Sequence, residues 1–168
     1  MLLKLNVARP DIRMADNLLA KLAAIRIVHG YTQEQLGKLM NCDQQSISKL
    51  ERSRDCHLGR LLRFLAHCNA QLEGIGPLHT NPVAAHEQVL KKLTHLRRRE
   101  GLSQYAVART TGLSQAYVSA LESGYRRTPM LDPRMSTLIG YLGCLGIKLA
   151  ITSNPNTDFL LVKKIPLS

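Results

Sequence analysis

The sequence predicts a mainly α-helical protein made of two similar helical bundles in tandem, with a short β-strand after the last helix of each. The first observation is an internal repeat, in which residues 32–51 and 103–122 match at a constant offset of 71. The second is the recurrence of apolar residues at helical spacing through both copies. The third is composition, because 45% of the residues are apolar but only 4% are aromatic, which is typical of small leucine- and alanine-packed helical domains. The 168 residues are therefore expected to form two small units.

Each copy of the repeat is predicted to fold as two short helices joined by a sharp turn. Thr32 and Asp43 precede the two helices of the first copy, where a side-chain oxygen can accept a hydrogen bond from an otherwise unpaired backbone N–H. Asn41 stands in the turn, which needs a residue that tolerates a left-handed backbone. The second copy has the equivalent residues Ser103, Gly112 and Ser114. A helix-turn-helix is therefore expected twice.

The segments around the repeats define the predicted boundaries. A leucine-rich first helix at about 16–29 precedes the first helix pair and ends at Gly30. After each pair, apolar residues at 58–65 and at 135–142 mark a further helix. The predicted divisions are a leader at 1–16, a first domain at 17–76, a linker at 77–86, a second domain at 87–152 and a C-terminal tail at 153–168.

Short strands are expected after the last helix of each unit. Residues 71–75 align with 148–152, and the offset between the copies has grown from 71 to 77, so six residues have been inserted within 124–133. One arrangement pairs 71–75 with 147–152 and joins the two halves in one sheet. The other is a hairpin of 147–152 with 159–163, whose exposed edges would favour a homodimer of whole chains through the C-terminal strands.

The net charge of the chain favours a polyanionic partner. It amounts to +11, divided as +4 over residues 1–82 and +7 over residues 83–168. A basic surface attracts DNA, although RNA or a membrane surface would select the same charge. No apolar run reaches the length of a membrane span, and the start of the chain lacks a signal-peptide cleavage site. We therefore expect DNA rather than a membrane as the partner.

The residues that could carry metal or covalent chemistry show no suitable spacing. The cysteines at positions 42, 56, 68 and 144 form no CxxC pair and match no zinc module. We expect reduced thiols in a cytosolic protein, with no metal and no cofactor. The sequence also shows no nucleophile–base constellation and no phosphate-binding loop, so an enzyme is not expected.

The two repeats resemble the Cro/C1-type (XRE) helix-turn-helix family of phage repressors and bacterial regulators. The run Gln44-Gln45-Ser46-Ile47 is close to the recognition helix of a lambdoid phage repressor, and the resemblance covers about 18–75 and 90–151. It implies two tandem lambda-repressor-like bundles, each placing the second helix of its pair in the major groove of a double-stranded DNA operator. It also implies a bacterial or phage protein of the cytoplasm and nucleoid.

One spacing inside the chain supports this resemblance. Arg26 precedes Glu51 by the same interval by which Arg97 precedes Glu122 (51 − 26 and 122 − 97). In the family, such a pair ties the first helix to the end of the recognition helix. We therefore expect two structural ion pairs, Arg26–Glu51 and Arg97–Glu122, rather than carboxylates available for acid–base chemistry.

The resemblance also implies which side chains contact DNA. Gln33 and Gln104 would contact a phosphate and brace Gln44 and Gln115, each eleven residues later in the chain. A glutamine amide such as that of Gln45 can form two hydrogen bonds with adenine in the major groove. The expected DNA contacts are Gln33, Gln44, Gln45, Ser46, Ser48, Lys49, Arg52 and Arg54 in the first unit, and Gln104, Gln115, Ala116, Tyr117, Ser119, Arg126 and Arg127 in the second.

Three functions from different classes fit these features. The leading one is a sequence-specific DNA-binding regulator with two reading heads, which would act as a pseudo-dimer on an asymmetric site. The second is an antitoxin-like protein that binds DNA and also masks a toxin. The third is a protein-interaction module in which one helix-turn-helix has lost DNA contact, and Ala116 and Ala120 make the second unit the candidate for that loss.

Overall fold

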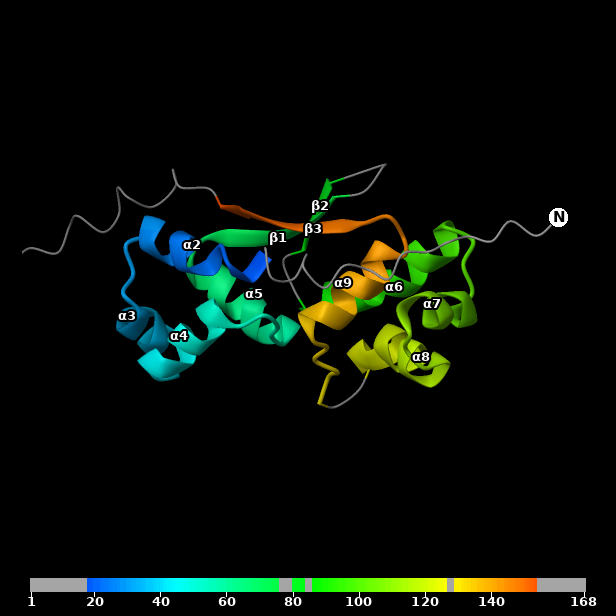
Figure 1. Ribbon diagram of the computed structural model, residues 1–168, viewed down its shortest axis with the longest axis horizontal. Coiled ribbons are helices and arrows are strands. Elements are labelled where there is room, and N and C mark those ends of the chain that lie inside the picture. The colour runs from blue at the N-terminus through cyan, green and yellow to red at the C-terminus, as the bar shows by residue number, and fades with distance from the viewer. Residues whose placement is uncertain (1–17, 76–79, 84–85, 127–128, 154–168) are drawn as a thin grey trace, which may run out of the picture.

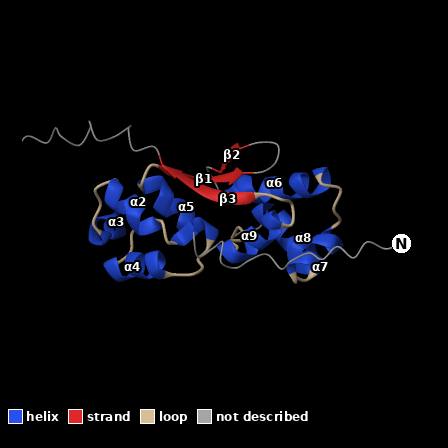
Figure 2. Ribbon diagram, turned by 45° about the horizontal axis from the view of Figure 1, so that its top comes forward, coloured by secondary structure: helices blue, strands red, loops and turns tan. Residues whose placement is uncertain are grey.

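The structure is a computed structural model, and it describes residues 18–75, 80–83, 86–126 and 129–153. Its helices form two groups side by side, and a small sheet lies along one side of both groups (Figures 1 and 2). The first group contains α2 (Leu22–Val28), α3 (Gln33–Leu39), α4 (Gln44–Arg52) and α5 (Leu58–His67). The second contains α6 (His86–Arg99), α7 (Gln104–Thr111), α8 (Gln115–Ser123), the short 3₁₀ helix η1 (Gly124–Arg126) and α9 (Met135–Gly143). The sheet contains β1 (Ala70–Ile75), β2 (Thr80–Val83) and β3 (Lys148–Ser153), and the predicted mainly helical fold class is confirmed.

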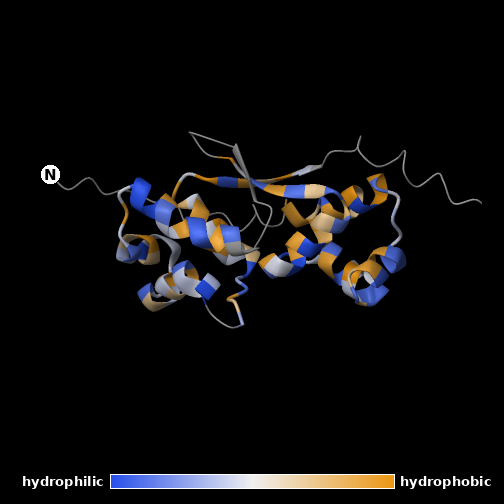
Figure 3. Cartoon of the chain, turned by 180° about the vertical axis from the view of Figure 1, so that it is seen from behind, coloured by the Kyte–Doolittle hydropathy of each residue, from blue (hydrophilic) through white to orange (hydrophobic). Residues whose placement is uncertain are grey.

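Each helical group is packed by the apolar residues that the sequence places at helical spacing. Leu19 and Leu22 are fully buried in the first group, as are Leu90 and Leu93 in the second. Figure 3 shows the resulting stripes of apolar and polar residues along the helices. Burying one such side chain stabilises the fold by about 1.5–3 kcal/mol, so these stripes hold each group together. Within the described residues, no helix combines the length and apolar character needed to cross a membrane.

The four predicted helix caps are present. The Thr32 hydroxyl accepts a hydrogen bond from Gln35 N at 3.1 Å, and an Asp43 carboxylate oxygen accepts one from the third backbone N–H of α4 at 2.7 Å. In the second unit, Ser103 and Ser114 accept the equivalent bonds at 3.0 Å and 3.1 Å. Each cap satisfies a backbone donor that has no partner inside its helix, which fixes where α3, α4, α7 and α8 begin.

The turn residues also adopt the predicted left-handed backbone. Asn41 has φ of +53° and Gly112 has φ of +75°. Gly30 and Gly101, which follow α2 and α6, have φ of +76° and +67°. Because only glycine and, less readily, asparagine adopt this conformation at low cost, these positions set the chain direction between the helices.

The first helix is interrupted rather than continuous. Leu18 and Leu19 are helical, Ala20 and Lys21 form a turn, and α2 begins at Leu22, so the described part of the expected helix at 16–29 consists of two helical pieces. The backbone N–H of Lys21 bonds to Leu18 O at 3.4 Å, which is the spacing of a turn rather than of an α-helix. The predicted leader at 1–16 lies outside the described residues.

The segment predicted as a linker contains a strand, so that prediction is wrong for part of its length. Residues 80–83 form β2, which pairs antiparallel with β1, and α6 begins directly afterwards at His86. Pro82 lacks a backbone N–H, but β2 is an edge strand with a single neighbour in the sheet order β2-β1-β3. An edge strand tolerates proline because its outer side forms no ladder bonds.

The strand pairing joins the two halves of the chain, as one of the two predicted arrangements requires. β1 and β3 are antiparallel, with Gln71 opposite Thr152 and Ile75 opposite Lys148. Lys148 is equivalent to Gln71 and Thr152 is equivalent to Ile75 at the offset of 77 (148 − 71 and 152 − 75). Each end of one strand therefore pairs with the equivalent of the other end, as a two-fold axis requires. The alternative partner strand at 159–163 lies outside the described residues.

A second junction joins the loops that precede α5 and α9. Leu58 N donates to Pro133 O at 2.9 Å, and Met135 N donates to Cys56 O at 2.8 Å. The two donors are again related by the offset of 77, and so are the two acceptors (135 − 58 and 133 − 56). The two halves are therefore related by an approximate two-fold axis at both junctions.

Each of these helices also receives its cap from the opposite unit. An Asp132 carboxylate oxygen accepts from Gly59 N at the start of α5 at 2.8 Å, and an Asp55 carboxylate oxygen accepts from Ser136 N at the start of α9 at 3.0 Å. The residues that directly precede α5 and α9 make no side-chain cap of their own. The helices of one unit thus depend on an aspartate of the other for a backbone partner.

Candidate nucleic-acid interface

Helices α4 and α8 lie on the side of the molecule away from the sheet, one in each helical group (Figures 1 and 2). On α4, Ile47 and Leu50 are buried against the core. The side chains of Gln44, Gln45 and Lys49 are exposed on the same helix. The predicted reading residues of the first unit therefore form a solvated polar face over an apolar one.

Two serines expected on this face accept hydrogen bonds from arginines of the protein itself. Arg52 donates to the Ser48 hydroxyl at 2.8 Å, which holds the guanidinium along α4. Arg60 of α5 donates to the backbone carbonyl of Ser46 at 2.8 Å. Ser46 and Ser48 are half-buried, so the most accessible part of the face is formed by the two glutamines and Lys49.

The equivalent face of α8 is less polar. Gln115, Ala116 and Ser119 are exposed, and Tyr117 is half-buried. Val118 is fully buried on the opposite side of the helix. The second face thus offers one glutamine amide where the first offers two, and an alanine methyl group in place of the second amide.

The predicted ion pair of the first unit is present beneath its face. Arg26 Nε donates to Glu51 Oε1 at 2.5 Å, and its Nη2 donates to Oε2 at 3.2 Å. Arg26 Nη1 donates to Tyr31 O at 2.8 Å, which ties the guanidinium to the loop after α2. The exposed fractions of the two charged side chains are 11% for Arg26 and 4% for Glu51. A two-point pair of this kind is stronger than a surface ion pair.

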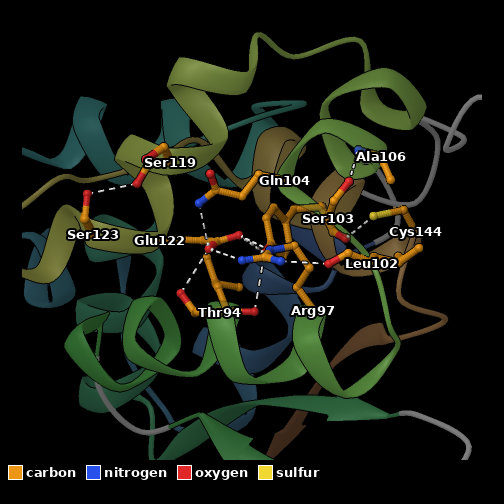
Figure 4. A network of polar contacts seen from close by, with 12 residues as sticks. Thr94, Arg97, Leu102, Ser103, Gln104, Ala106, Ser119, Glu122, Ser123 and Cys144 are labelled. Carbon is orange, nitrogen blue, oxygen red and sulfur yellow. Dashed lines mark hydrogen bonds and ion pairs between the residues drawn. The ribbon is translucent and has the colours of Figure 1, made fainter.

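The ion pair of the second unit carries more hydrogen bonds (Figure 4). Arg97 Nε and Nη2 donate to the two Glu122 oxygens at 2.6 Å and 2.9 Å. The Tyr141 hydroxyl donates to Glu122 Oε1 at 2.7 Å, and the Thr94 hydroxyl donates to Oε2 at 3.0 Å. Every proton donor around this carboxylate favours its charged form.

These contacts change the pKa of the carboxyl group and of its partners. Burial alone would raise the pKa of Glu122, but hydrogen bonds led by those from Arg97 and Tyr141 outweigh burial and lower the pKa to about 2. The hydrogen bond to Glu122 raises the pKa of Arg97. Burial, followed by the neighbouring carboxylate, raises the pKa of the Tyr141 phenol. Glu122 is therefore a permanently charged structural group at neutral pH.

The positions of Gln33 and Gln104 differ from the expectation. The resemblance implies that they brace Gln44 and Gln115, but the amide Nε2 atoms donate to the ion-pair carboxylates instead, from Gln33 to Glu51 at 2.9 Å and from Gln104 to Glu122 at 3.1 Å. The reason is that folding places a charged acceptor, the carboxylate at the end of the recognition helix, beside the start of the preceding helix. The glutamines remain half-buried at the edge of the face.

The loops after the recognition helices contribute further cations. Arg54 is exposed after α4. In the second unit, Arg126 Nε donates to the Tyr125 hydroxyl at 2.9 Å, so this arginine is held on an aromatic ring in η1. Arg127, also expected to contact DNA, lies outside the described residues.

Within the described ranges, no group of histidine, cysteine and carboxylate side chains is arranged to hold a metal ion. Burial raises the pKa of the thiol of Cys56 to about 12, and it raises the pKa of Cys68 and of Cys144 to about 11 each. These three thiols stay protonated at neutral pH and are poor nucleophiles.

Sequence reasoning missed several residues that organise the site. Thr94 and Tyr141 complete the second carboxylate site, but no spacing rule in the chain points to them. Asp55 and Asp132 were missed although a signal existed, because they are related by the same offset of 77 (132 − 55) and each shortly precedes the first core position of a helix. Arg60 was also missed. It lies on α5 and donates a hydrogen bond to the backbone of α4.

Comparison with known protein families gives a match to part of the chain. Residues 93–150 match the family model described as Helix-turn-helix. This segment runs from within α6 through α7, α8 and α9 into β3, so it covers most of the second unit. No curated protein and no solved structure matches the chain. The second unit is therefore similar to a helix-turn-helix family, which suggests a DNA-binding transcription regulator, and the first unit lies outside the matched segment.

Proposed function

We propose that the chain is a sequence-specific regulator that binds double-stranded DNA with two reading heads, α4 and α8, as a pseudo-dimer within one chain. The observation that carries this proposal is the two-fold correspondence of the two units at both junctions, with β1 on β3 and with Asp55 and Asp132 capping opposite helices. Helix-turn-helix dimers read two half-sites about 34–36 Å apart. A chain that already contains the two-fold arrangement presents two heads without a second copy.

The two heads are expected to read different half-sites. The first exposes Gln44 and Gln45, whose amides can each form two hydrogen bonds with adenine. The second exposes Gln115 beside Ala116, whose methyl group suits an apolar contact with thymine. Because the faces differ, the preferred DNA site is asymmetric rather than palindromic.

Selection of bound sites from random double-stranded DNA by the full chain tests this function. Footprinting and light scattering on the selected site should show one chain covering two dissimilar half-sites, about one helical turn apart. A palindromic site occupied by two chains, with the same head in each half, would reject the pseudo-dimer. Failure to enrich any sequence would reject sequence-specific reading.

The reading residues can be tested on the same site. Gln44→Ala should weaken binding by about 1–3 kcal/mol and relax the preference at one base pair. Gln115→Ala should do the same in the other half-site. Gln71→Ala, which removes an exposed glutamine from β1, is the matched control and should leave both affinity and preference unchanged.

One observation favours a protein partner as a second function. Ile27 and Val28 at the end of α2 are 64% and 53% exposed, which is unusual for two adjacent aliphatic side chains on a helix. An antitoxin-like protein would bury such residues against its toxin. Purification of the chain from its native host should then recover a second protein in stoichiometric amount, and recovery of the chain alone would reject this function.

A further inference from the structure

Helix α4 is held at its two ends by different contacts. Its last turn is fixed by the ion pair of Glu51 with Arg26. Its first turn carries Gln44 and Gln45, which the proposed function assigns to base reading, and both of these side chains are exposed. The contacts that fix the first turn therefore set the position of the two amides.

One residue of this first turn is bound through both of its backbone polar groups. Ser46 N donates to an Asp43 carboxylate oxygen at 2.7 Å, which is a cap within the helix itself. Ser46 O accepts from Arg60 Nη2 at 2.8 Å, and Arg60 lies on α5. The pKa of the Asp43 carboxyl is lowered first by its hydrogen bonds with Ser46, and the charges of Lys49 and Arg60 lower it further. Arg60 thus ties the start of α4 to another helix and lies near its cap.

The backbone beside Arg60 is fixed by the second unit. Arg60 directly follows Gly59, whose backbone N–H donates to Asp132 at 2.8 Å. Helix α5 lies between α4 and the sheet (Figures 1 and 2). The bond from the half-buried guanidinium to the helix carbonyl is charge-assisted, so it is stronger than a bond between neutral groups. Arg60 therefore connects the start of α4 to the junction of the two units.

The second unit holds its recognition helix differently. At the offset of 77, the position equivalent to Arg60 is Thr137, whose side chain is too short to reach as far as an arginine (137 − 60). Helix α9 instead supplies the Tyr141 hydroxyl, which donates to Glu122 near the end of α8 at 2.7 Å. The first unit has Phe64 at that place. Thus α5 ties the start of one recognition helix, and α9 ties the end of the other.

We propose that Arg60 is a positioning residue of the first head, which holds the start of α4 so that Gln44 and Gln45 meet the bases in one fixed orientation. The inference rests on the proposed function, because it gives Arg60 a role in base reading. A glutamine amide forms two hydrogen bonds with adenine only when both bonds are well aligned, so a small rotation of α4 would weaken them. The other role open to an arginine near DNA is a direct phosphate contact, and the test separates the two roles.

The test compares Arg60→Met with the wild type on the site that the full chain selects. Methionine keeps much of the apolar stem of arginine and removes the guanidinium. The discrimination at the base pairs read by Gln44 and Gln45 should fall by about fivefold or more, because one well-placed pair of hydrogen bonds is responsible for at least that factor. The discrimination at the base pair read by Gln115 should be unchanged, and so should the slope of log affinity against log salt concentration.

The matched control is Arg63→Met, which removes an exposed arginine from the same helix and should leave the discrimination in both half-sites unchanged. Arg60→Lys, which keeps the charge and a donor on a long side chain, should restore part of the discrimination lost in Arg60→Met. If Arg60→Met discriminates as the wild type does, the inference is overturned. A salt slope lowered by about 0.9 in Arg60→Met would identify a direct phosphate contact and would also overturn it. In both cases the wild type still reads DNA, so the proposed function stands.

A measurement without DNA tests the hold on the helix by itself. Amide hydrogen exchange in α4 of the free chain should be several-fold faster in Arg60→Met than in Arg63→Met, and exchange in α8 should be equal, which verifies that both variants are folded. Equal exchange in α4 of the two variants would overturn the inference, whatever the chain binds. Faster exchange in α4, together with a wild type that selects no DNA sequence, would refute the proposed function and with it the role of Arg60 in base reading.

Discussion

The two units build the same ion pair with different surroundings. In the first, the Glu51 carboxylate accepts hydrogen bonds from Arg26 and Gln33. In the second, the Glu122 carboxylate has the same two kinds of donor and two further hydroxyl donors, Thr94 and Tyr141. The first unit has Ala23 and Phe64 at the equivalent positions, offset by 71 and 77 respectively.

This difference shows that the arginine–glutamate–glutamine arrangement is sufficient for the fold and that hydroxyl donors are an addition. Phe64 and Tyr141 are both fully buried, so the ring fills the same space in each unit. The Tyr141 hydroxyl is tolerated in the core because it has a partner there, since a buried hydroxyl without one costs about 1–3 kcal/mol. The second unit should therefore depend more strongly on its carboxylate than the first.

The turns between the paired helices differ in a similar way. In the first unit, Cys42 N donates to Gly37 O at 2.8 Å, and a Cβ atom at position 37 would lie 2.8 Å from Cys42 O. The second unit has Ala108 at the equivalent position. In its turn, Leu113 N donates to the Thr111 hydroxyl at 3.4 Å, and that hydroxyl donates to the Val107 carbonyl within α7 at 2.7 Å. Two different local contacts therefore support the same crossing of two helices.

The largest expected effect is the loss of either carboxylate. Glu122→Ala should destabilise the second unit by about 3–5 kcal/mol, because it leaves a buried arginine and a buried phenol without their partner. Glu51→Ala should cost less, because only Arg26 and Gln33 lose a hydrogen bond. Urea unfolding with amide hydrogen exchange in α4 and α8 separates the two units. Equal losses in the two variants would contradict the difference inferred between them.

Acid should remove part of the same stabilisation without a mutation. The folded-state pKa of Glu122, about 2, lies below its ordinary value of 4.5, so its contribution is complete above pH 4.5 and is lost as the pH falls towards 2. Stability measured across this window should decline less steeply in Glu122→Gln than in the wild type. If the stability of the variant and of the wild type fell equally with pH, the Glu122 carboxyl group would not contribute to the acid sensitivity of the fold.

A smaller effect is expected when only the added hydroxyl is removed. Tyr141→Phe recreates the residue type of the first unit and should cost about 1.5–3 kcal/mol, the usual contribution of a hydrogen bond to a charged group. Tyr105→Phe is the matched control, because that side chain is 61% exposed and its loss should be close to zero. Thermal unfolding of the two variants provides the measurement. If the unfolding temperature of Tyr141→Phe equals that of the wild type, the added hydroxyl does not make the second unit differ from the first in stability.

The smallest effects are expected at the junction, where each unit supplies one aspartate cap and Asp55 also accepts a hydrogen bond from the Ser136 hydroxyl at 2.8 Å. Asp55→Ala and Asp132→Ala should each cost about 0.5–2 kcal/mol, the usual contribution of a helix cap. Asparagine caps helices as well as aspartate does, so Asp55→Asn and Asp132→Asn should restore most of the stability. Chemical denaturation of the four variants tests the two-fold relation, which would be refuted if alanine were harmful at one position and harmless at the other.

The sequence by itself determined the features that depend on neighbouring residues. The caps at Thr32, Asp43, Ser103 and Ser114 were predictable because the bonds that they make span three residues. The left-handed turns were predictable because few residue types tolerate that backbone. The two ion pairs join residues that are distant in the chain, and they were predictable only because the chain contains the pattern twice and resembles a known family.

Only the tertiary structure decided how the two units meet. The partners of Asp55 and Asp132 lie 81 and 73 residues away, and no local rule connects them. The strand at 80–83 forms because β1 offers it an edge, in a segment whose prolines suggested a linker. Gln33 and Gln104 turned to the carboxylates because folding places a charged acceptor beside them. These contacts depend on the packing of whole helices and strands, which local propensity does not encode.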